Sequence, residues 1–258
     1  MREFACYPLV PFSNRIADAT LRWHRDTFAL PRYLPAEPHA IHGNGWQRRW
    51  NIVEQNASRA LLELVHDPVG EHAREWPFAF RARQEFTLVD RGLTLHLDIS
   101  NTGDRTFPFG LGWHPYFPRS ADMEIGFRAG GVWLTDATRL PTLHAAVSPA
   151  WDFTTPRRIG PTCMDNCFTG WRQPALVRWP SRALAVELTA DVACDHLVVF
   201  VPEEQDFIAI EPVTHMTDAF NRAAIGHPDT GTRLLAPREG FSCTMRLSVV
   251  TPIDALRV

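Results

Sequence analysis

Apolar and polar residues alternate along one long stretch of this chain, which predicts an antiparallel hairpin. Apolar side chains stand at positions 78, 80, 82, 86 and 88, with Gln84 as the exception. After an Asp-Arg-Gly turn at residues 90–92, apolar residues at 93, 95, 97 and 99 alternate with polar ones. A period of two sends successive side chains to opposite faces of a strand, so these runs predict paired strands with one buried face.

Similar strand-like runs recur along the chain, and a helical pattern appears only near residues 217–224. Many short strands with turn residues between them favour a β-sandwich or barrel. We therefore predict one all-β domain over residues 1–258, a large antiparallel β-sandwich. Residues 138–170 carry little strand pattern and are expected to form a long connection of the kind that often holds a site. The other predicted strands span residues 60–65, 183–189, 196–201, 207–210 and 241–250.

Composition fits a globular domain and excludes several classes of partner. The 258 residues are 45% hydrophobic and 21% charged, with a formal net charge of −3, which argues against nucleic acid or a membrane surface as a partner. The 21 prolines, 16 phenylalanines and 9 tryptophans suit strands better than a helical bundle.

The cysteines and the chain start favour a cytoplasmic protein. Five cysteines make an odd set, and four of them are widely spaced, so we expect reduced thiols. Two prolines interrupt the apolar stretch near the start, which does not read as a signal peptide, and no run is long enough to span a membrane.

Two short motifs, far apart in the sequence, each place a titratable group beside a proline. His114 lies in Gly-Trp-His-Pro-Tyr-Phe-Pro at residues 112–118, and Glu211 lies in Ile-Glu-Pro-Val-Thr-His at residues 210–215. A lone histidine is more often structural, but a carboxylate at the end of a buried strand is costly unless it is paired or functional. Together they are candidates for a general acid and a general base.

Other candidate residues have an ordinary structural interpretation as well as a functional one. Arg15, in Ser-Asn-Arg, reads in isolation as a surface arginine after a turn. His42 and Trp46 lie in a Gly-rich segment that could approach a ligand closely or form a hairpin turn. Asp165 reads as a loop carboxylate beside an aromatic residue or as a turn residue.

Motifs for metal, nucleotide and serine-nucleophile chemistry are missing from the sequence. The eleven histidines include no His-x-x-x-His or His-Glu-x-x-His pattern on a predicted helix, and no Gly-x-Gly-x-x-Gly, Walker or Gly-x-Ser-x-Gly motif occurs. We therefore predict no metal and no other cofactor.

Five motifs, taken in order, resemble the bacterial branch of the aldose 1-epimerase (galactose mutarotase) family over nearly the full chain. They are Asn-Arg-Ile at 14–16, His-Ala-Ile-His-Gly at 39–43, Trp-His-Pro-Tyr-Phe at 113–117, Asp-Asn-Cys-Phe at 165–168 and Ile-Glu-Pro-Val-Thr-His at 210–215. The resemblance implies a large antiparallel β-sandwich that holds a monosaccharide on its concave face.

The resemblance also implies roles for particular residues. Glu211 matches the catalytic base and His114 the catalytic acid. Arg15, His42 and Asp165 match substrate-binding positions, and Asn14 and Trp46 are weaker additions to that set. Trp46 or Phe168 could cover an apolar face of the sugar.

One departure from the family concerns the start of the chain. Family members usually carry a strand-rich segment before the Cys-Tyr-Pro-Leu-Val-Pro-Phe stretch, and this chain begins almost at that stretch. A sheet edge without its usual neighbour invites pairing with another chain, and a homodimer is one outcome.

The sequence leaves alternatives to an anomer-interconverting enzyme open. One is an epimerase for an anionic hexose, with Arg15, Arg48 and Arg49 as an anion site. Another is a sugar-binding module without catalysis, against which the presence of both His114 and Glu211 argues.

Overall fold

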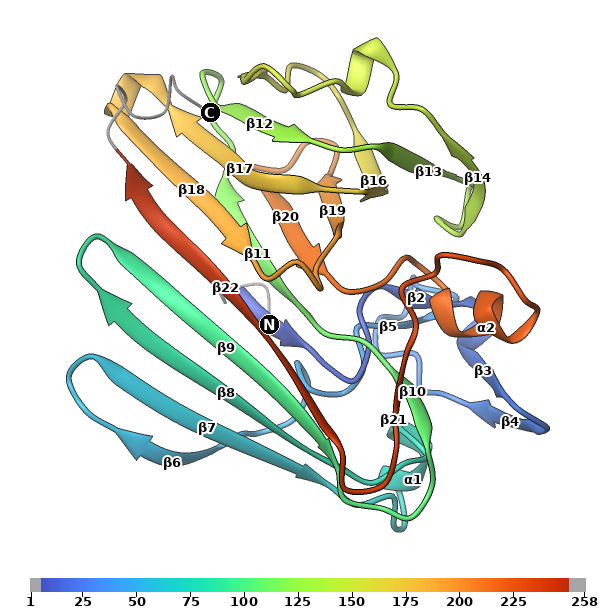
Figure 1. Ribbon diagram of the computed structural model, residues 1–258. Helices are drawn as coiled ribbons and strands as arrows, with labels where there is room; N and C mark the ends of the chain where they lie inside the picture. The colour runs from blue at the N-terminus through green and yellow to red at the C-terminus, as the bar shows by residue number, and fades with distance from the viewer. Residues whose placement is uncertain (1–5, 251–258) are drawn as a thin grey trace.

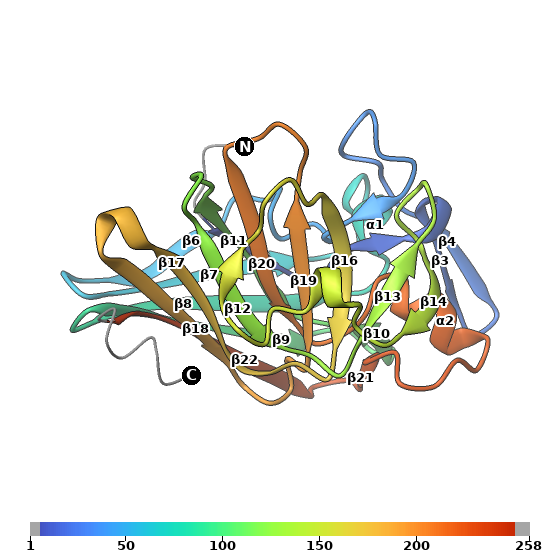
Figure 2. The same cartoon turned by 90° about the horizontal axis from the view of Figure 1, so that it is seen from above.

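Two large antiparallel sheets enclose one hydrophobic core in the computed structural model, which describes residues 6–250. Core residues come from both sheets, for example Val132 and Ile208 from one and Leu97 and Leu188 from the other. Figure 2 shows the strands of the smaller sheet running across those of the larger one. The predicted β-sandwich is therefore confirmed.

The smaller sheet has seven strands in the order β1-β11-β20-β19-β16-β13-β14, all antiparallel (Figure 1). Neighbouring strands come from distant parts of the chain, so residues far apart in the sequence lie side by side. The strands are β1 (Cys6–Leu9), β11 (Gly112–Pro118), β20 (Phe207–Val213), β19 (His196–Val201), β16 (Met164–Thr169), β13 (Gly131–Thr135) and β14 (Pro141–Ala145).

The larger sheet has nine strands in the order β15-β12-β17-β18-β22-β9-β8-β7-β6. The predicted hairpin is present within it, since β8 and β9 pair from Phe80 opposite Asn101 to Val89 opposite Gly92. The strands are β15 (Arg157–Arg158), β12 (Glu124–Arg128), β17 (Arg172–Trp179), β18 (Leu184–Ala190), β22 (Gly240–Val250), β9 (Gly92–Asn101), β8 (Phe80–Val89), β7 (Arg59–His66) and β6 (Asn51–Gln55).

Short elements connect the two sheets. The predicted helix is present as α2, and no helix of the described residues is long and apolar enough to cross a membrane. These elements are β2 (Arg15–Ile16) with β5 (Ala40–Ile41), β3 (Thr20–Trp23) with β4 (Asp26–Ala29), β10 (Phe107–Phe109) with β21 (Arg233–Leu235), α1 (His72–Glu75), α2 (Ala219–Ala224) and three 3-10 turns at Ala17–Ala19, Pro149–Trp151 and Pro180–Arg182.

The expectation of a long connection at residues 138–170 was wrong. This segment contains β14, β15 and β16, so Asp165 lies on a strand and not in a loop. In β16 the residues 166–168 are all buried, so both faces of the strand are covered and the alternation that marks a half-exposed strand is missing.

The larger sheet ends in an uncovered strand. All five residues of β6 are exposed, including Ile52 at 64% and Val53 at 51%. Among residues 6–250, β6 pairs with β7 alone, and the homodimer stays a prediction.

The glycines near His42 have a packing role that the sequence did not reveal. Gly43 has a φ of +68° and bridges Val10, and a Cβ on Gly43 would lie 2.4 Å from the carbonyl oxygen of Val10. The close approach is therefore to the chain's own backbone, which holds the His42 segment against the end of β1.

Gly43→Ala is expected to lower the free energy of unfolding by about 3 kcal/mol, because it adds a backbone collision to left-handed strain. Gly70→Ala is the matched control, since Gly70 has a φ of +62° but open space around its Cβ position. We expect a loss of about 1 kcal/mol there. Urea unfolding measures both, and equal losses would show that the contact with Val10 is unimportant.

Candidate active site

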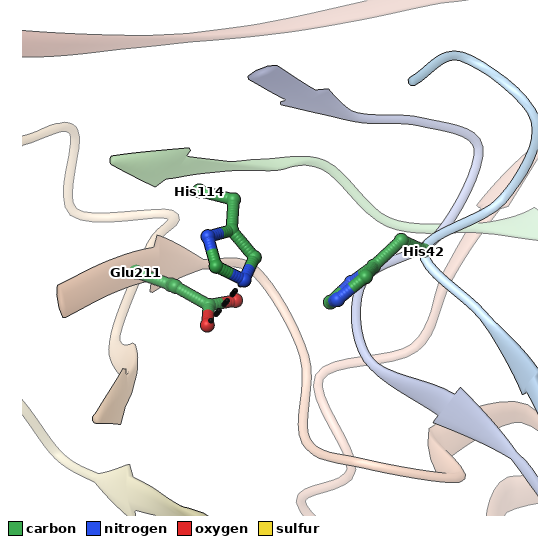
Figure 3. Close-up of side chains that lie close together, drawn as sticks. All are labelled: His42, His114 and Glu211. Carbon is green, nitrogen blue, oxygen red and sulfur yellow. Dashed lines mark ion pairs between the residues drawn. The ribbon is translucent and has the colours of Figure 1, made fainter. Parts of the chain in front are cut away.

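His114 and Glu211 meet on neighbouring strands of the seven-stranded sheet. The pairing of β11 with β20 sets Gly112 opposite Val213 and Tyr116 opposite Ala209, so His114 lies level with Glu211. Nε2 of His114 lies 3.2 Å from Oε1 of Glu211 (Figure 3). Their exposed fractions are 4% and 2%. The two predicted acid–base groups thus form one buried, directly contacting pair.

Burial shifts the pKa values of this pair in opposite directions. It lowers the pKa of His114 to about 3. It is also the largest cause of the pKa of Glu211 lying well above its usual value; the charge of Asp165 adds to this and that of Arg15 opposes it. Both charged forms are disfavoured, so the proton of the pair resides on Glu211, and Nε2 of His114 accepts the hydrogen bond that Glu211 donates.

Two polar atoms of the pair are buried without a hydrogen-bond partner among residues 6–250. They are Nδ1 of His114 and Oε2 of Glu211. A buried polar atom left unpaired costs free energy, and such atoms concentrate at functional sites. Oε2 of Glu211 is therefore free to accept a hydroxyl of a bound molecule.

Two tyrosine rings hold the imidazole of His114. The ring of Tyr7 stacks on it with centroids 4.6 Å apart, and the ring of Tyr116 lies at 4.5 Å. Burial raises the pKa of Tyr7, so its hydroxyl stays protonated. Phe117, the neighbour of Tyr116, is buried against Trp179 on the other face of β11. Tyr7 was missed, because only the β1–β11 pairing brings it opposite His114.

His42 lies beside the pair as a hydrogen-bond donor. Its ring centroid is 5.2 Å from that of His114. The ring Nδ1 of His42 accepts a hydrogen bond from the backbone N–H of Asn14 at 3.1 Å. The backbone N–H of His42 donates to the carbonyl oxygen of Asn14 at 2.9 Å. With Nδ1 occupied as an acceptor, the ring hydrogen lies on Nε2. Burial, followed by the charges of His114 and Arg15, keeps the pKa of His42 well below its usual value.

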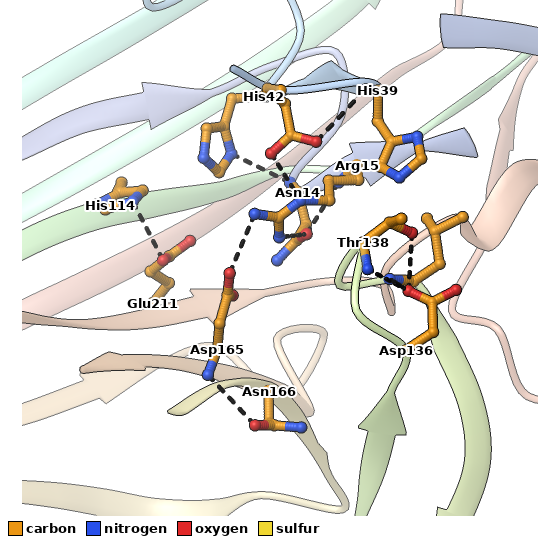
Figure 4. Close-up of polar contacts among 12 residues, drawn as sticks. Asn14, Arg15, His39, His42, His114, Asp136, Thr138, Asp165, Asn166 and Glu211 are labelled. Carbon is orange, nitrogen blue, oxygen red and sulfur yellow. Dashed lines mark hydrogen bonds and ion pairs between the residues drawn. The ribbon is translucent and has the colours of Figure 1, made fainter. Parts of the chain in front are cut away.

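Arg15 is buried within a network of acceptors, so the interpretation as a surface arginine was wrong. It donates from Nε to Glu37 and from an η nitrogen to Asp165, both at 3.0 Å. A further η nitrogen donates to the side chain of Asn14 at 3.2 Å (Figure 4). Asn14 has a φ of +55°, which turns the chain so that Arg15 points toward Asp165.

Glu37 is a site residue that the sequence analysis missed. It lies between two prolines in the segment before β5, and nothing in the sequence marks it as a partner of Arg15, which is 22 positions earlier.

Trp46 forms an aromatic wall beside the pair. It stacks on Tyr7 with centroids 5.5 Å apart, and its indole N–H donates to the carbonyl of Gly43 at 3.1 Å. Phe168, the other suggested cover for a sugar, is fully buried against Phe127 and Trp151 and belongs to the core.

His42, His114 and Glu211 have ligand atoms within 4.8 Å of one another, which is a spacing a metal ion could use. The hydrogen bonds argue against this use. Nδ1 of His42 accepts the Asn14 N–H, so Nε2 carries the hydrogen and has no lone pair for a metal. The donor set fits hydrogen bonding to an oxygen-rich ligand better than coordination of an ion.

The candidate site is identified by its converging titratable groups and not by the size of a cavity. A cavity of about 540 Å³ lies past the end of β11 and is lined by Arg119, Met123 and Asp206, among others, but by none of the residues described above. Arg119 there donates to the carbonyls of Pro202 and Gly160, so its hydrogen bonds are internal to the protein.

His215, in the same motif as Glu211, has a structural role. Its Nε2 accepts the backbone N–H of Ser13 at 3.0 Å and its Nδ1 donates to the carbonyl of Met216 at 2.7 Å. Burial lowers its pKa to about 4.

The structure brings together all seven residues that the sequence nominated: Asn14, Arg15, His42, Trp46, His114, Asp165 and Glu211. Their individual roles stay predictions. The fold and site define an antiparallel β-sandwich with a histidine–glutamate pair buried in its smaller sheet. The family model for aldose 1-epimerase matches residues 1–248, and the chain belongs to this family.

Relatives support the same family and fold. The chain is 32% identical to the uncharacterised protein YphB of Escherichia coli K12 over 96% of this chain and 84% of that protein. It superposes with a TM-score of 0.86 on a crystal structure from E. coli K12, provisionally assigned as an aldose 1-epimerase, at 28% identity over 97% of this chain and 85% of that one. A galactose mutarotase-like protein from Clostridium acetobutylicum has a TM-score of 0.81 at 18% identity, covering 95% of this chain and 79% of that one, and shares the fold.

The low pKa of His215 predicts how folding stability depends on pH. Between about pH 4 and 6.5 the unfolded histidine binds a proton that the folded one does not, so stability falls as pH drops through this window. The loss amounts to about 2 kcal/mol at pH 5 for this residue. Urea unfolding at pH 5 and 7.5 should show a smaller difference for His215→Gln than for the wild type. An unchanged difference would assign the pH dependence to other groups.

Proposed function

We propose that this protein interconverts the α and β anomers of a neutral aldose by opening and closing the sugar ring. Membership of the aldose 1-epimerase family supports this class of reaction. The observation that carries the proposal is the buried contact of 3.2 Å between His114 and Glu211, which holds one proton between an acid and a base.

The pair of His114 and Glu211 carries one proton between them, which is enough for ring opening without a proton from solvent. Moving the proton of Glu211 across the contact to His114 produces a carboxylate and an imidazolium. Glu211 then accepts the proton of the C1 hydroxyl, the bond between C1 and the ring oxygen breaks, and the ring oxygen takes the proton of His114. The pair returns to its neutral form, which burial favours, and closure on the other face of C1 after rotation reverses these steps.

Arg15 and Asp165 support a pair of sugar hydroxyls. Three of the five guanidinium N–H groups contact Glu37, Asp165 and Asn14, which leaves two for a ligand. Asp165 uses Oδ2 for Arg15, so the other oxygen can accept a hydroxyl hydrogen. The free N–H groups of Arg15 and the second oxygen of Asp165 thus place donors beside an acceptor. Two neighbouring sugar hydroxyls can bind there, because each hydroxyl can both donate and accept a hydrogen bond.

The charges around the site favour a neutral sugar over an anionic one. Arg15 contacts two carboxylates. Arg48, suggested as an anion-binding residue, donates to Glu75 at 2.9 Å and contacts His72 at 2.7 Å, and Arg49 is exposed. The guanidinium groups that could hold a phosphate or sulfonate are thus either paired or on the surface.

A sugar-binding module without catalysis is the competing function. Such a protein would not need a buried acid and base in direct contact, with exposed fractions of 4% for His114 and 2% for Glu211. An anomer-interconversion assay by polarimetry or NMR, across glucose, galactose and their phosphorylated and sulfonated analogues, distinguishes the two.

Glu211→Gln is expected to abolish nearly all anomer interconversion with the fold intact. The amide keeps the size of the side chain but cannot accept the C1 proton, and one positioned proton transfer contributes about 10²–10⁴-fold. The rate of equilibration of α-glucose measures this, with circular dichroism as the check on folding. Full activity in this variant would remove Glu211 from the mechanism.

His114→Asn is expected to reduce kcat far more than it weakens sugar binding, because the imidazole supplies a proton to the ring oxygen only as the ring opens. Steady-state kinetics together with calorimetric binding of the sugar separates the two effects. Weaker binding with unchanged turnover of the bound sugar would make His114 a binding residue.

The arginines are expected to differ sharply. Arg15→Ala should lower kcat/KM for a neutral aldose by about tenfold to a hundredfold, the loss expected for a charge-assisted hydrogen bond. Arg48→Ala and Arg49→Ala should change it by less than about twofold. A large loss in the Arg48 or Arg49 variants confined to anionic sugars would instead favour an anionic substrate.

A further inference from the structure

We infer that Glu37 is a specificity-determining residue, whose charge makes the sugar site accept neutral aldoses and disfavour aldoses that carry an anionic group. The inference rests on the proposed function and assigns part of its selectivity to a residue that does not belong to the acid–base pair.

Glu37 is held in place from two directions. Its Oε2 accepts a hydrogen bond from Nε of Arg15 at 3.0 Å, and its Oε1 accepts one from the backbone N–H of His39 at 3.4 Å. The side chains of Arg15 and Glu37 are only 10% and 12% exposed. Salt screens such buried charges only weakly, so the charge of Glu37 acts on groups in the site at ordinary ionic strength.

Glu37 changes the charge balance around Arg15. With Asp165 alone, the guanidinium would form a neutral pair. The second carboxylate gives the three side chains a net charge of −1. A phosphate, sulfonate or carboxylate on a bound sugar would therefore meet like charge in a poorly screened place.

Glu37 also influences the acid–base pair through Arg15. Removing its negative charge leaves the positive charge of Arg15 less compensated, and that charge opposes the rise in the pKa of Glu211. Because the neutral pair with its proton on Glu211 is the competent form, the alkaline limb of kcat/KM is then expected to move to lower pH. The titratable groups that act on or face Glu211 are His114 from β11, Arg15 from β2, Asp165 and Cys167 from β16, Cys6 and Tyr7 from β1, and His42 beside the pair.

The variant Glu37→Gln removes the charge; its amide oxygen can still accept a hydrogen bond from Nε of Arg15, while the long contact with the His39 N–H at 3.4 Å is given up. Glu75→Gln is the matched control, since Glu75 also accepts an arginine at 2.9 Å with a similar exposed fraction. We expect the ratio of kcat/KM for glucose to that for glucose 6-phosphate to fall about fivefold to tenfold in Glu37→Gln and to stay unchanged in Glu75→Gln. Glu37→Asp, which keeps the charge, should retain most of the wild-type ratio.

The ratio of dissociation constants for the same two sugars, measured by calorimetry, tests Glu37 independently of turnover. A wild type that binds glucose but does not interconvert its anomers would contradict the proposed function and leave this binding ratio as the test of Glu37. An unchanged ratio in Glu37→Gln, or an equal fall in Glu37→Asp, would overturn the charge role of Glu37. A wild type that binds neither sugar would overturn both proposals.

Discussion

The burial of an acid and a base against each other is the interaction on which the site depends. His114 and Glu211 lie buried on the adjacent interior strands β11 and β20, where water cannot stabilise either charge. Each would be costly there alone, and together they hold a single proton in a neutral form. In the proposed reaction, ring opening moves one proton into this pair and one proton out of it, so the pair ends in the protonation state that burial favours.

A second layer of charge surrounds this pair and, in the proposed function, holds the ligand. Arg15 is buried because Glu37, Asp165 and Asn14 together satisfy three of its donors. These acceptors come from three separate segments, so the guanidinium is fixed at the point where they meet. In the proposed function, the remaining donors and the second oxygen of Asp165 bind hydroxyl groups, and we infer that the excess carboxylate disfavours an anion.

Irregular backbone after the end of β1 positions the proposed binding residues. Asn14 and His42 both have positive φ values, of +55° and +64°, and each bonds to the other's backbone. Gly43 then contacts Val10 directly, which no larger residue could do without a collision. This contact places the Nε2 hydrogen of His42 beside His114. A strained segment that points a side chain at a site is a common use of such conformations.

The sequence by itself determined the class of fold, because alternation with a period of two marks each half-buried strand, as in β8 and β9. It also nominated His114 and Glu211, since a carboxylate at the end of the predicted strand 207–210 and beside a proline is conspicuous on local grounds. The structure extends that strand to Val213, so Glu211 lies inside β20. Tertiary structure alone decided the rest. β16 escaped recognition because burial on both faces removes alternation. The sequence did not identify Glu37 or Tyr7, because their partners lie far away in the chain. Glu37 pairs with Arg15, more than twenty positions earlier, and Tyr7 packs on His114, more than a hundred positions later. Only strand pairing and loop packing bring these groups into contact.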